Sequence, residues 1–271
     1  MCAACFPASA DDTPKASIDA PIGNIVSAYP DFIERIDSND LVWRDGTRMP
    51  LDDGKSIKPF AAWLADPDIE DTLRIPYPAG AGEAVPAPDT DPGRARNAHF
   101  FDKMYGDCRK GEVKRNLTTI VWLPRKARQR LEVTAVNGVA QRLEAVSREL
   151  DDLAASFDKF LAPAGGTYNC RTIAGTDRAS AHGYGIAIDI AVSSSDYWRW
   201  APGAAAGKVS YRNRIPLEIV RIFERHGFIW GGRWYHYDTM HFEYRPELLP
   251  PLAPLPGAPR SSPPEPARPG R

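Results

Sequence analysis

Residues 180–191 read Ser180-Ala-His-Gly-Tyr-Gly-Ile-Ala-Ile-Asp189-Ile-Ala191. From Ile186 onward, isoleucine alternates with alanine or aspartate. This two-residue period predicts a strand with a bulky face for the core and a face of small residues. Asp189 lies on the small-residue face, and a carboxylate in so apolar a strand is costly unless a cation or hydrogen bonds compensate it. The small neighbours leave room for a metal and a substrate, and His182, in the turn before the strand, can reach the same point.

A second polar segment follows about fifty residues later, Trp230-Gly-Gly-Arg-Trp-Tyr-His-Tyr-Asp-Thr-Met-His-Phe-Glu243. Catalytic zinc takes three protein ligands of N, S or O type and leaves one position for water. His241 supplies the third ligand beside His182 and Asp189. Asp238, three residues before His241, is expected in a tight loop from which it reaches the water as a general base.

The two-part pattern S-x-H-x-x-G-x-A-x-D, then W-G-G-x-W and D-x-x-H-F-E, resembles the zinc metallopeptidase family of D-alanyl-D-alanine carboxypeptidases, vancomycin-resistance dipeptidases and L-alanyl-D-glutamate phage endolysins. The resemblance covers residues 167–244. It implies one zinc ion held by His182, Asp189 and His241, with Asp238 as the catalytic base.

The resemblance also implies that Arg171 orients the substrate and stabilises the oxyanion, a role that suits a permanently charged guanidinium. The dipeptidase branch of the family has Glu where this chain has Asp238. Aspartate there, together with Trp230-Gly-Gly-Arg-Trp234, is more similar to the endopeptidase branch. Either D-alanyl-D-alanine carboxypeptidase or L-alanyl-D-glutamate endopeptidase activity on peptidoglycan stem peptides is therefore implied.

Four further side chains are candidates around this site. Trp230 and His236 are predicted to contact substrate in the cleft. Ser180 either bonds a substrate carboxylate or caps its own turn. Glu243 shares strand parity with His241, so it either orients that ligand or forms an ordinary salt bridge.

The remaining pattern predicts an α+β fold. A β-rich run at 117–123 precedes an amphipathic helix expected from about Asn137 to Phe157, stopped by Pro163, and a second helix runs from Pro216 to Gly227. A short hairpin is predicted around Asp45-Gly46, a short helix through Phe60, Trp63 and Leu64, and a loop over 79–96. The resemblance implies the arrangement of hedgehog domains and D,D-peptidases, a small mainly antiparallel sheet that carries the metal ligands and is backed by helices.

The 271 residues are predicted to divide into four parts. Residues 1–10 resemble the end of a secretory signal, in which Cys2 and Cys5 form a C-x-x-C pair without a partner pair. Residues 11–95 form an N-terminal extension that either narrows the cleft or packs on its outside. A zinc peptidase domain is expected over 96–249, followed by a disordered, proline-rich tail over 250–271.

Composition excludes several classes of partner. The 34 Lys and Arg balance 35 Asp and Glu, so bulk charge does not favour nucleic acid, and no apolar run is long enough to span a membrane. Export to the periplasm or medium is expected, where Cys108 and Cys170 either pair or remain separate thiols. A competing hypothesis is a non-catalytic, zinc-stabilised wall-binding module, and another is an enzyme for free D-amino dipeptides. The sequence predicts no oligomeric state.

Overall fold

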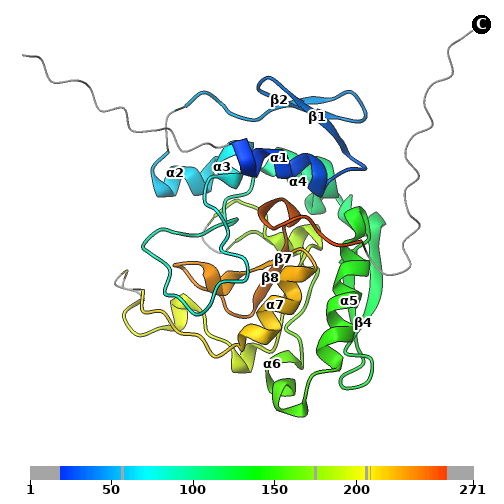
Figure 1. Ribbon diagram of the computed structural model, residues 1–271, viewed down its shortest axis with the longest axis vertical. Coiled ribbons are helices and arrows are strands. Elements are labelled where there is room, and N and C mark those ends of the chain that lie inside the picture. The colour runs from blue at the N-terminus through cyan, green and yellow to red at the C-terminus, as the bar shows by residue number, and fades with distance from the viewer. Residues whose placement is uncertain (1–18, 56–57, 174–175, 205–206, 208, 255–271) are drawn as a thin grey trace, which may run out of the picture.

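The computed structural model describes residues 19–55, 58–173, 176–204, 207 and 209–254. Within them, helices alternate with three small sheets in which every strand pairing is antiparallel, which confirms the predicted α+β class (Figure 1). The predicted signal remnant with Cys2 and Cys5, and residues 255–271 of the predicted tail, lie outside the described residues. No helix in the described part of the chain is long and apolar enough to cross a membrane.

The N-terminal residues form a helix, a three-stranded sheet and two short helices. The predicted hairpin is confirmed, since Leu41 pairs with Met49 across the turn at Asp45-Gly46. The predicted short helix at Phe60 is also confirmed, and residues 79–96 contain no helix or strand. The elements are α1 (Asp19–Ala28), β1 (Ile33–Asp37), β2 (Asp40–Trp43), β3 (Arg48–Pro50), α2 (Phe60–Ala65) and α3 (Ile69–Leu73).

The middle of the chain contains the long helix, which is shorter than predicted. It ends at Asp151, where its buried carboxylate accepts the backbone N–H groups of Arg125 and Lys126 and ties the helix end to the β4–β5 connection. The apolar spacing continues past this point because Leu153 and Phe157 pack on the same core from the following turns. The elements are α4 (Ala98–Tyr105), β4 (Leu117–Trp122), β5 (Gln129–Thr134), α5 (Val139–Asp151) and α6 (Asp158–Leu161).

The third sheet has the order β6-β8-β7 and places two predicted ligands side by side. Asp189 pairs directly with His241 across β6 and β8. The next residue of β8, Phe242, points to the opposite face of the sheet. Its ring stacks there on Phe223 of α7, with 3.8 Å between the ring centroids. The helix thus backs the sheet, as predicted. The elements are β6 (Ala187–Asp189), α7 (Leu217–Arg225), β7 (Phe228–Trp230) and β8 (His241–Tyr244).

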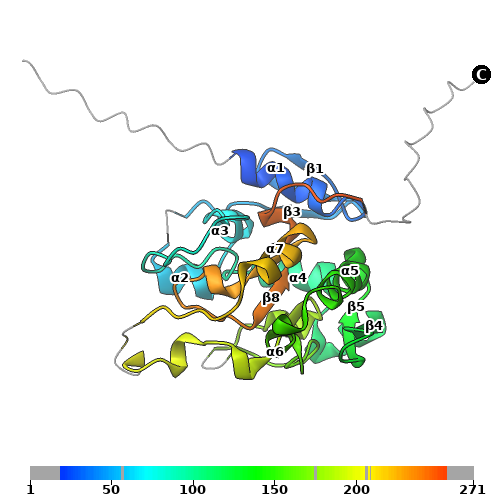
Figure 2. The same cartoon turned by 60° about the horizontal axis from the view of Figure 1, so that its bottom comes forward.

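The N-terminal extension shares one core with the rest of the chain. Ile25 and Trp43 belong to the same buried cluster as Phe100. In Figure 2, α1, β1 and β3 lie across the top of the remaining elements, and α2 and α3 lie to one side of α7 and β8. Buried polar contacts add to this packing: the Tyr29 hydroxyl donates to Glu247 at 2.7 Å and the Tyr77 hydroxyl donates to Glu224 at 2.8 Å. The boundary at residue 95 stays a prediction, but apolar packing continues across it.

Replacing Tyr77 with phenylalanine tests whether these buried polar contacts hold the N-terminal extension to the rest of the chain. Its hydroxyl donates to Glu224 and accepts the backbone N–H of Trp230 at 3.0 Å, so its loss leaves the buried N–H of Trp230 unpaired and removes one of the hydrogen bonds to the Glu224 carboxylate. We expect the free energy of unfolding to fall by about 1–3 kcal/mol, measured by urea denaturation. Tyr235→Phe, at a partly exposed tyrosine, is the matched control and should change stability little. Equal stability of both variants would contradict the attachment.

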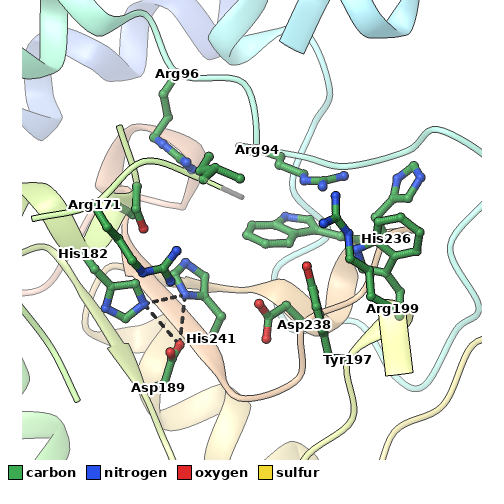
Figure 3. Close-up of a pocket in the computed structure, with 15 residues that line it drawn as sticks. Arg94, Arg96, Arg171, His182, Asp189, Tyr197, Arg199, His236, Asp238 and His241 are labelled. Atoms are coloured by element: carbon green, nitrogen blue, oxygen red, sulfur yellow. Dashed lines mark hydrogen bonds and ion pairs between the residues drawn. The ribbon is translucent and has the colours of Figure 1, made fainter. Parts of the chain in front are cut away.

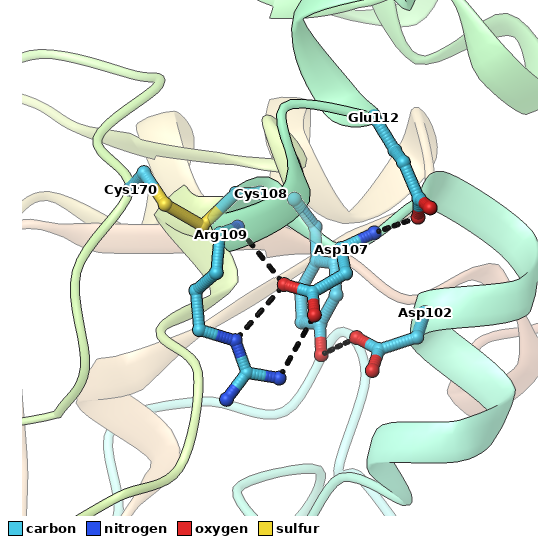
Figure 4. Close-up of a disulfide and its surroundings, with 7 residues drawn as sticks. Asp102, Asp107, Cys108, Arg109, Glu112 and Cys170 are labelled. Atoms are coloured by element: carbon cyan, nitrogen blue, oxygen red, sulfur yellow. Dashed lines mark hydrogen bonds and ion pairs between the residues drawn. A yellow bond between two sulfur atoms is a disulfide. The ribbon is translucent and has the colours of Figure 1, made fainter.

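A disulfide joins Cys108 to Cys170, which resolves the alternative left open by the sequence (Figure 4). It lies behind the turn that carries His182, where Gly183 permits close approach: a Cβ there would lie 3.3 Å from the Cys108 sulfur. The bridge therefore supports both the turn with His182 and the segment that contains Arg171.

Replacing both cysteines by serine should cost about 4 kcal/mol of stability, because the bridge closes a long loop in the unfolded chain. The two residues are 62 positions apart. Thermal unfolding of oxidised protein and of the double variant measures the loss. Reductant should lower the melting temperature of the wild-type protein and leave that of the variant unchanged; a reductant effect on both would show another cause.

Candidate active site

Three elements bring the predicted metal ligands together (Figure 3). His182 lies in the 3-10 turn η5 (Ala181–Tyr184), Asp189 ends β6, and His241 begins β8. Nε2 of His182 lies 3.2 Å from Nδ1 of His241 and 3.2 Å from Oδ1 of Asp189. The third side of the triangle, from His241 Nδ1 to Asp189 Oδ1, is 3.1 Å.

The hydrogen bonds around this triangle leave lone pairs pointing into it. His182 Nδ1 lies 2.6 Å from the carbonyl oxygen of Thr167, which only accepts, so Nδ1 carries the proton. His241 Nε2 likewise donates to Glu243 at 3.0 Å. Three lone-pair atoms facing one another repel unless a cation lies among them. Their separations match the tetrahedron edge of about 3.3 Å that zinc bonds of about 2.0 Å require.

A proton is the alternative occupant of the triangle. Burial lowers the pKa of His241, but hydrogen bonds and charge from Asp189 and Glu243 outweigh burial and raise this pKa to about 10. Burial also opposes ionisation of Asp189, yet its contacts with both histidines hold the pKa of its carboxyl well below the usual range. Metal binding therefore has to displace a proton from the site.

Glu243 serves both of the roles that the sequence left open. It accepts from His241, and it forms ion pairs with Arg96 and Arg245, each at 3.0 Å. Although burial opposes ionisation, Arg96 and these other partners hold the pKa of Glu243 well below its usual range. A fixed carboxylate behind a histidine sets the tautomer and the ring orientation of the ligand.

Asp238 lines the same pocket as the three ligands, and Figure 3 shows its carboxylate turned toward them. Its Oδ1 is buried without a hydrogen-bond partner, and burial raises its pKa to about 6. The backbone reaches this position because Gly231 has no side chain: a Cβ there would lie 2.5 Å from the carbonyl oxygen of Asp238. An unpartnered carboxylate with a pKa near neutrality can accept a proton from water.

Arg171 and Ser180 also line the pocket. The Arg171 side chain is exposed and reaches toward the ligands in Figure 3, while its carbonyl accepts the backbone N–H of Ser180. Ser180 precedes η5, but its hydroxyl makes no capping hydrogen bond, so the capping interpretation is wrong.

The structure places His236 in the pocket and Trp230 outside it. His236 is held by Asp91, which accepts from its Nδ1 at 2.8 Å. Trp230 is 1% exposed and its indole donates to the carbonyl of Thr239, so it contributes packing beneath the site instead of a contact surface for substrate. Trp234 of the same motif lines the pocket in its place.

Sequence reasoning missed the cationic and aromatic side chains that complete the pocket. They come from the predicted loop over 79–96 and from the segment after β6. No spacing rule would have found them, because both segments are irregular and their approach to the sheet is set by tertiary contacts. They are Arg94, Arg96, Tyr197, Trp198 and Arg199.

Comparison with known families agrees with this geometry. Residues 174–244 match the family described as D-alanyl-D-alanine carboxypeptidase, and the match contains all three ligands and Asp238 but begins after Arg171. The resemblance drawn from the motifs is thereby confirmed over this segment. Residues 174–244 are therefore similar to the D-alanyl-D-alanine carboxypeptidase family, and this similarity supports a peptidase function. No curated protein and no solved structure matches it.

Proposed function

We propose that this protein is a zinc-dependent peptidase that hydrolyses an amide bond in peptidoglycan stem peptides. The observation that carries the proposal is the triangle of lone-pair donors from His182, Asp189 and His241 beside the unpartnered carboxylate of Asp238. A zinc ion bound there would act as a Lewis acid that polarises the scissile carbonyl and acidifies a water molecule.

The side chains of the pocket have distinct roles in this proposal. Asp238 accepts a proton from the attacking water and returns it to the leaving amine. Arg171 donates hydrogen bonds to the oxyanion or holds the substrate. Ser180 and His236 are proposed to contact the peptide, since both line the pocket. Glu243 holds His241 in the tautomer that presents Nδ1 to the metal.

The competing hypothesis of a non-catalytic wall-binding module explains the site less well. A structural zinc site is closed by four protein ligands. Here three donors meet, and Asp238 lies beside them with an oxygen that bonds to nothing within the described residues. An enzyme for free D-amino dipeptides would use the same chemistry, so substrate comparison has to separate it.

The disulfide supports a location outside the cytosol. Such bonds persist in oxidising compartments and are rare where thiols are kept reduced. Since Cys108 and Cys170 are bonded, we propose that the protein works in the periplasm or outside the cell, where peptidoglycan is accessible.

Mass spectrometry of digested muropeptides, with and without a chelator, tests the proposed function. We expect either loss of a terminal D-alanine or a cut between L-alanine and D-glutamate, and the chelator should abolish it. A free D-alanyl-D-alanine dipeptide in a parallel reaction distinguishes the dipeptidase alternative. No cleavage by a zinc-loaded protein that binds wall fragments would favour the binding module.

A further inference from the structure

The pocket has cationic side chains at two separate ends. Arg171 reaches toward the metal ligands, whereas Arg94 and Arg199 lie with His236 on the far side of Asp238 (Figure 3). Arg94 comes from the N-terminal extension and Arg199 from the turn η7 (Trp198–Trp200). Segments far apart in the sequence thus place two guanidinium groups at the end of the pocket opposite Arg171.

The positive charge of this pocket exceeds what its carboxylates neutralise. Arg96 is paired with Glu243, and Arg94 with the buried Asp91. Arg171 and Arg199 form no ion pair within the part of the chain that the structure describes. A divalent ion at the triangle would be balanced by Asp189 and Asp238 together. Two positive charges then remain, one at each end.

Arg94 and Arg199 are also held in place. Asp91 forms an ion pair with Arg94. It also accepts hydrogen bonds from the backbone N–H and the ring Nδ1 of His236. The Arg199 guanidinium lies over the Trp198 ring, 5.1 Å from the ring centroid, which is within the limit of about 6 Å for a cation–π contact. Stacking leaves the edges of the guanidinium free to donate, and two parallel N–H groups match the oxygens of a carboxylate.

We infer that Arg199, supported by Arg94, binds a second carboxylate of the substrate at the end of the pocket opposite Arg171. This inference rests on the proposed function and narrows it to peptides with two anionic groups. In a stem peptide the second carboxylate is either the free α-carboxylate of D-glutamate or the C-terminal carboxylate. Both present the same chemistry to a guanidinium.

Three synthetic stem peptides test the inference: the free acid, its D-glutamyl α-carboxamide and its C-terminal amide. We expect one of the two amides to lose about 10- to 100-fold in kcat/KM with the wild-type enzyme, the range for a lost hydrogen bond between charged groups. The amide with the reduced kcat/KM identifies which carboxylate of the stem peptide Arg199 binds. With the free acid as substrate, Arg199→Gln should have a kcat/KM lower than that of the wild-type enzyme by the same factor. With that amide as substrate, the variant and the wild-type enzyme should have equal kcat/KM.

Two controls complete the design. Arg199→Lys keeps the charge without the paired donors, so its kcat/KM on the free acid should lie between those of the wild-type enzyme and Arg199→Gln. Arg130→Gln changes an exposed arginine of β5 and should have the kcat/KM of the wild-type enzyme. Calorimetric binding of the same peptides to Asp238→Asn protein shows the preference in Kd whether or not a bond is cut. The inference would be overturned if Arg199→Gln lowered kcat/KM equally for the free acid and both amides, or if it changed kcat/KM for none of them. Absent hydrolysis with an intact binding preference would instead overturn the proposed function.

Discussion

Replacing Asp238 by asparagine should lower kcat for stem-peptide hydrolysis by about 10²- to 10⁴-fold, the usual contribution of a general base. The amide has nearly the same shape but cannot take a proton from water. The bound zinc should remain stoichiometric, since the three ligands are unchanged. Single-turnover kinetics with metal analysis of the same sample measures both quantities.

The matched control for this variant is Asp31→Asn, which removes a charge from an exposed carboxylate outside the pocket. It should leave kcat unchanged. If Asp238→Asn hydrolysed peptides at the wild-type rate, Asp238 would not be the base. Loss of zinc together with activity would show that Asp238 supports the metal and would leave its role as base without support.

Substituting His182 by alanine should weaken zinc affinity by more than about 100-fold, since outer-shell partners alone account for 10- to 100-fold. Peptide hydrolysis should fall with it. His182 supplies one of the three donor atoms that meet at this site. Competition with a fluorescent zinc chelator measures the affinity, and circular dichroism reports whether the variant folds.

His99→Ala is the control for this measurement, because His99 is exposed on α4 and lies outside the pocket. Its zinc affinity should equal that of the wild-type protein. A folded His182→Ala protein with unchanged zinc content and affinity would contradict the ligand assignment. Hydrolysis that survives full removal of zinc would contradict the whole mechanism.

The sequence could predict that His182, Asp189 and His241 lie together because much of their placement is encoded at short range. Asp189 interrupts an apolar strand, and His241 and Asp238 lie three residues apart, so one strand and one tight loop place them. Their approach to His182 followed from the two-part family pattern. The strand register then brings Asp189 directly opposite His241.

Local patterns failed where distant contacts override them. The spacing of apolar residues predicts a helix to Phe157, but Asp151 bonds to the β4–β5 connection and the helix ends there. Trp230 and Trp234 stand in the same glycine-rich motif, and sequence does not distinguish them. Packing buries the first beneath the sheet and turns the second toward the pocket.

The sequence by itself therefore determined the α+β class and predicted that His182, Asp189 and His241 lie together, because these features depend on strand periodicity and short spacings. Only the tertiary structure decided which side chains form the rest of the pocket. Arg94 and Arg96 lie in an irregular segment whose position comes from buried contacts such as the Arg96 pair with Glu243. Such contacts join residues more than one hundred positions apart, and no local pattern encodes them.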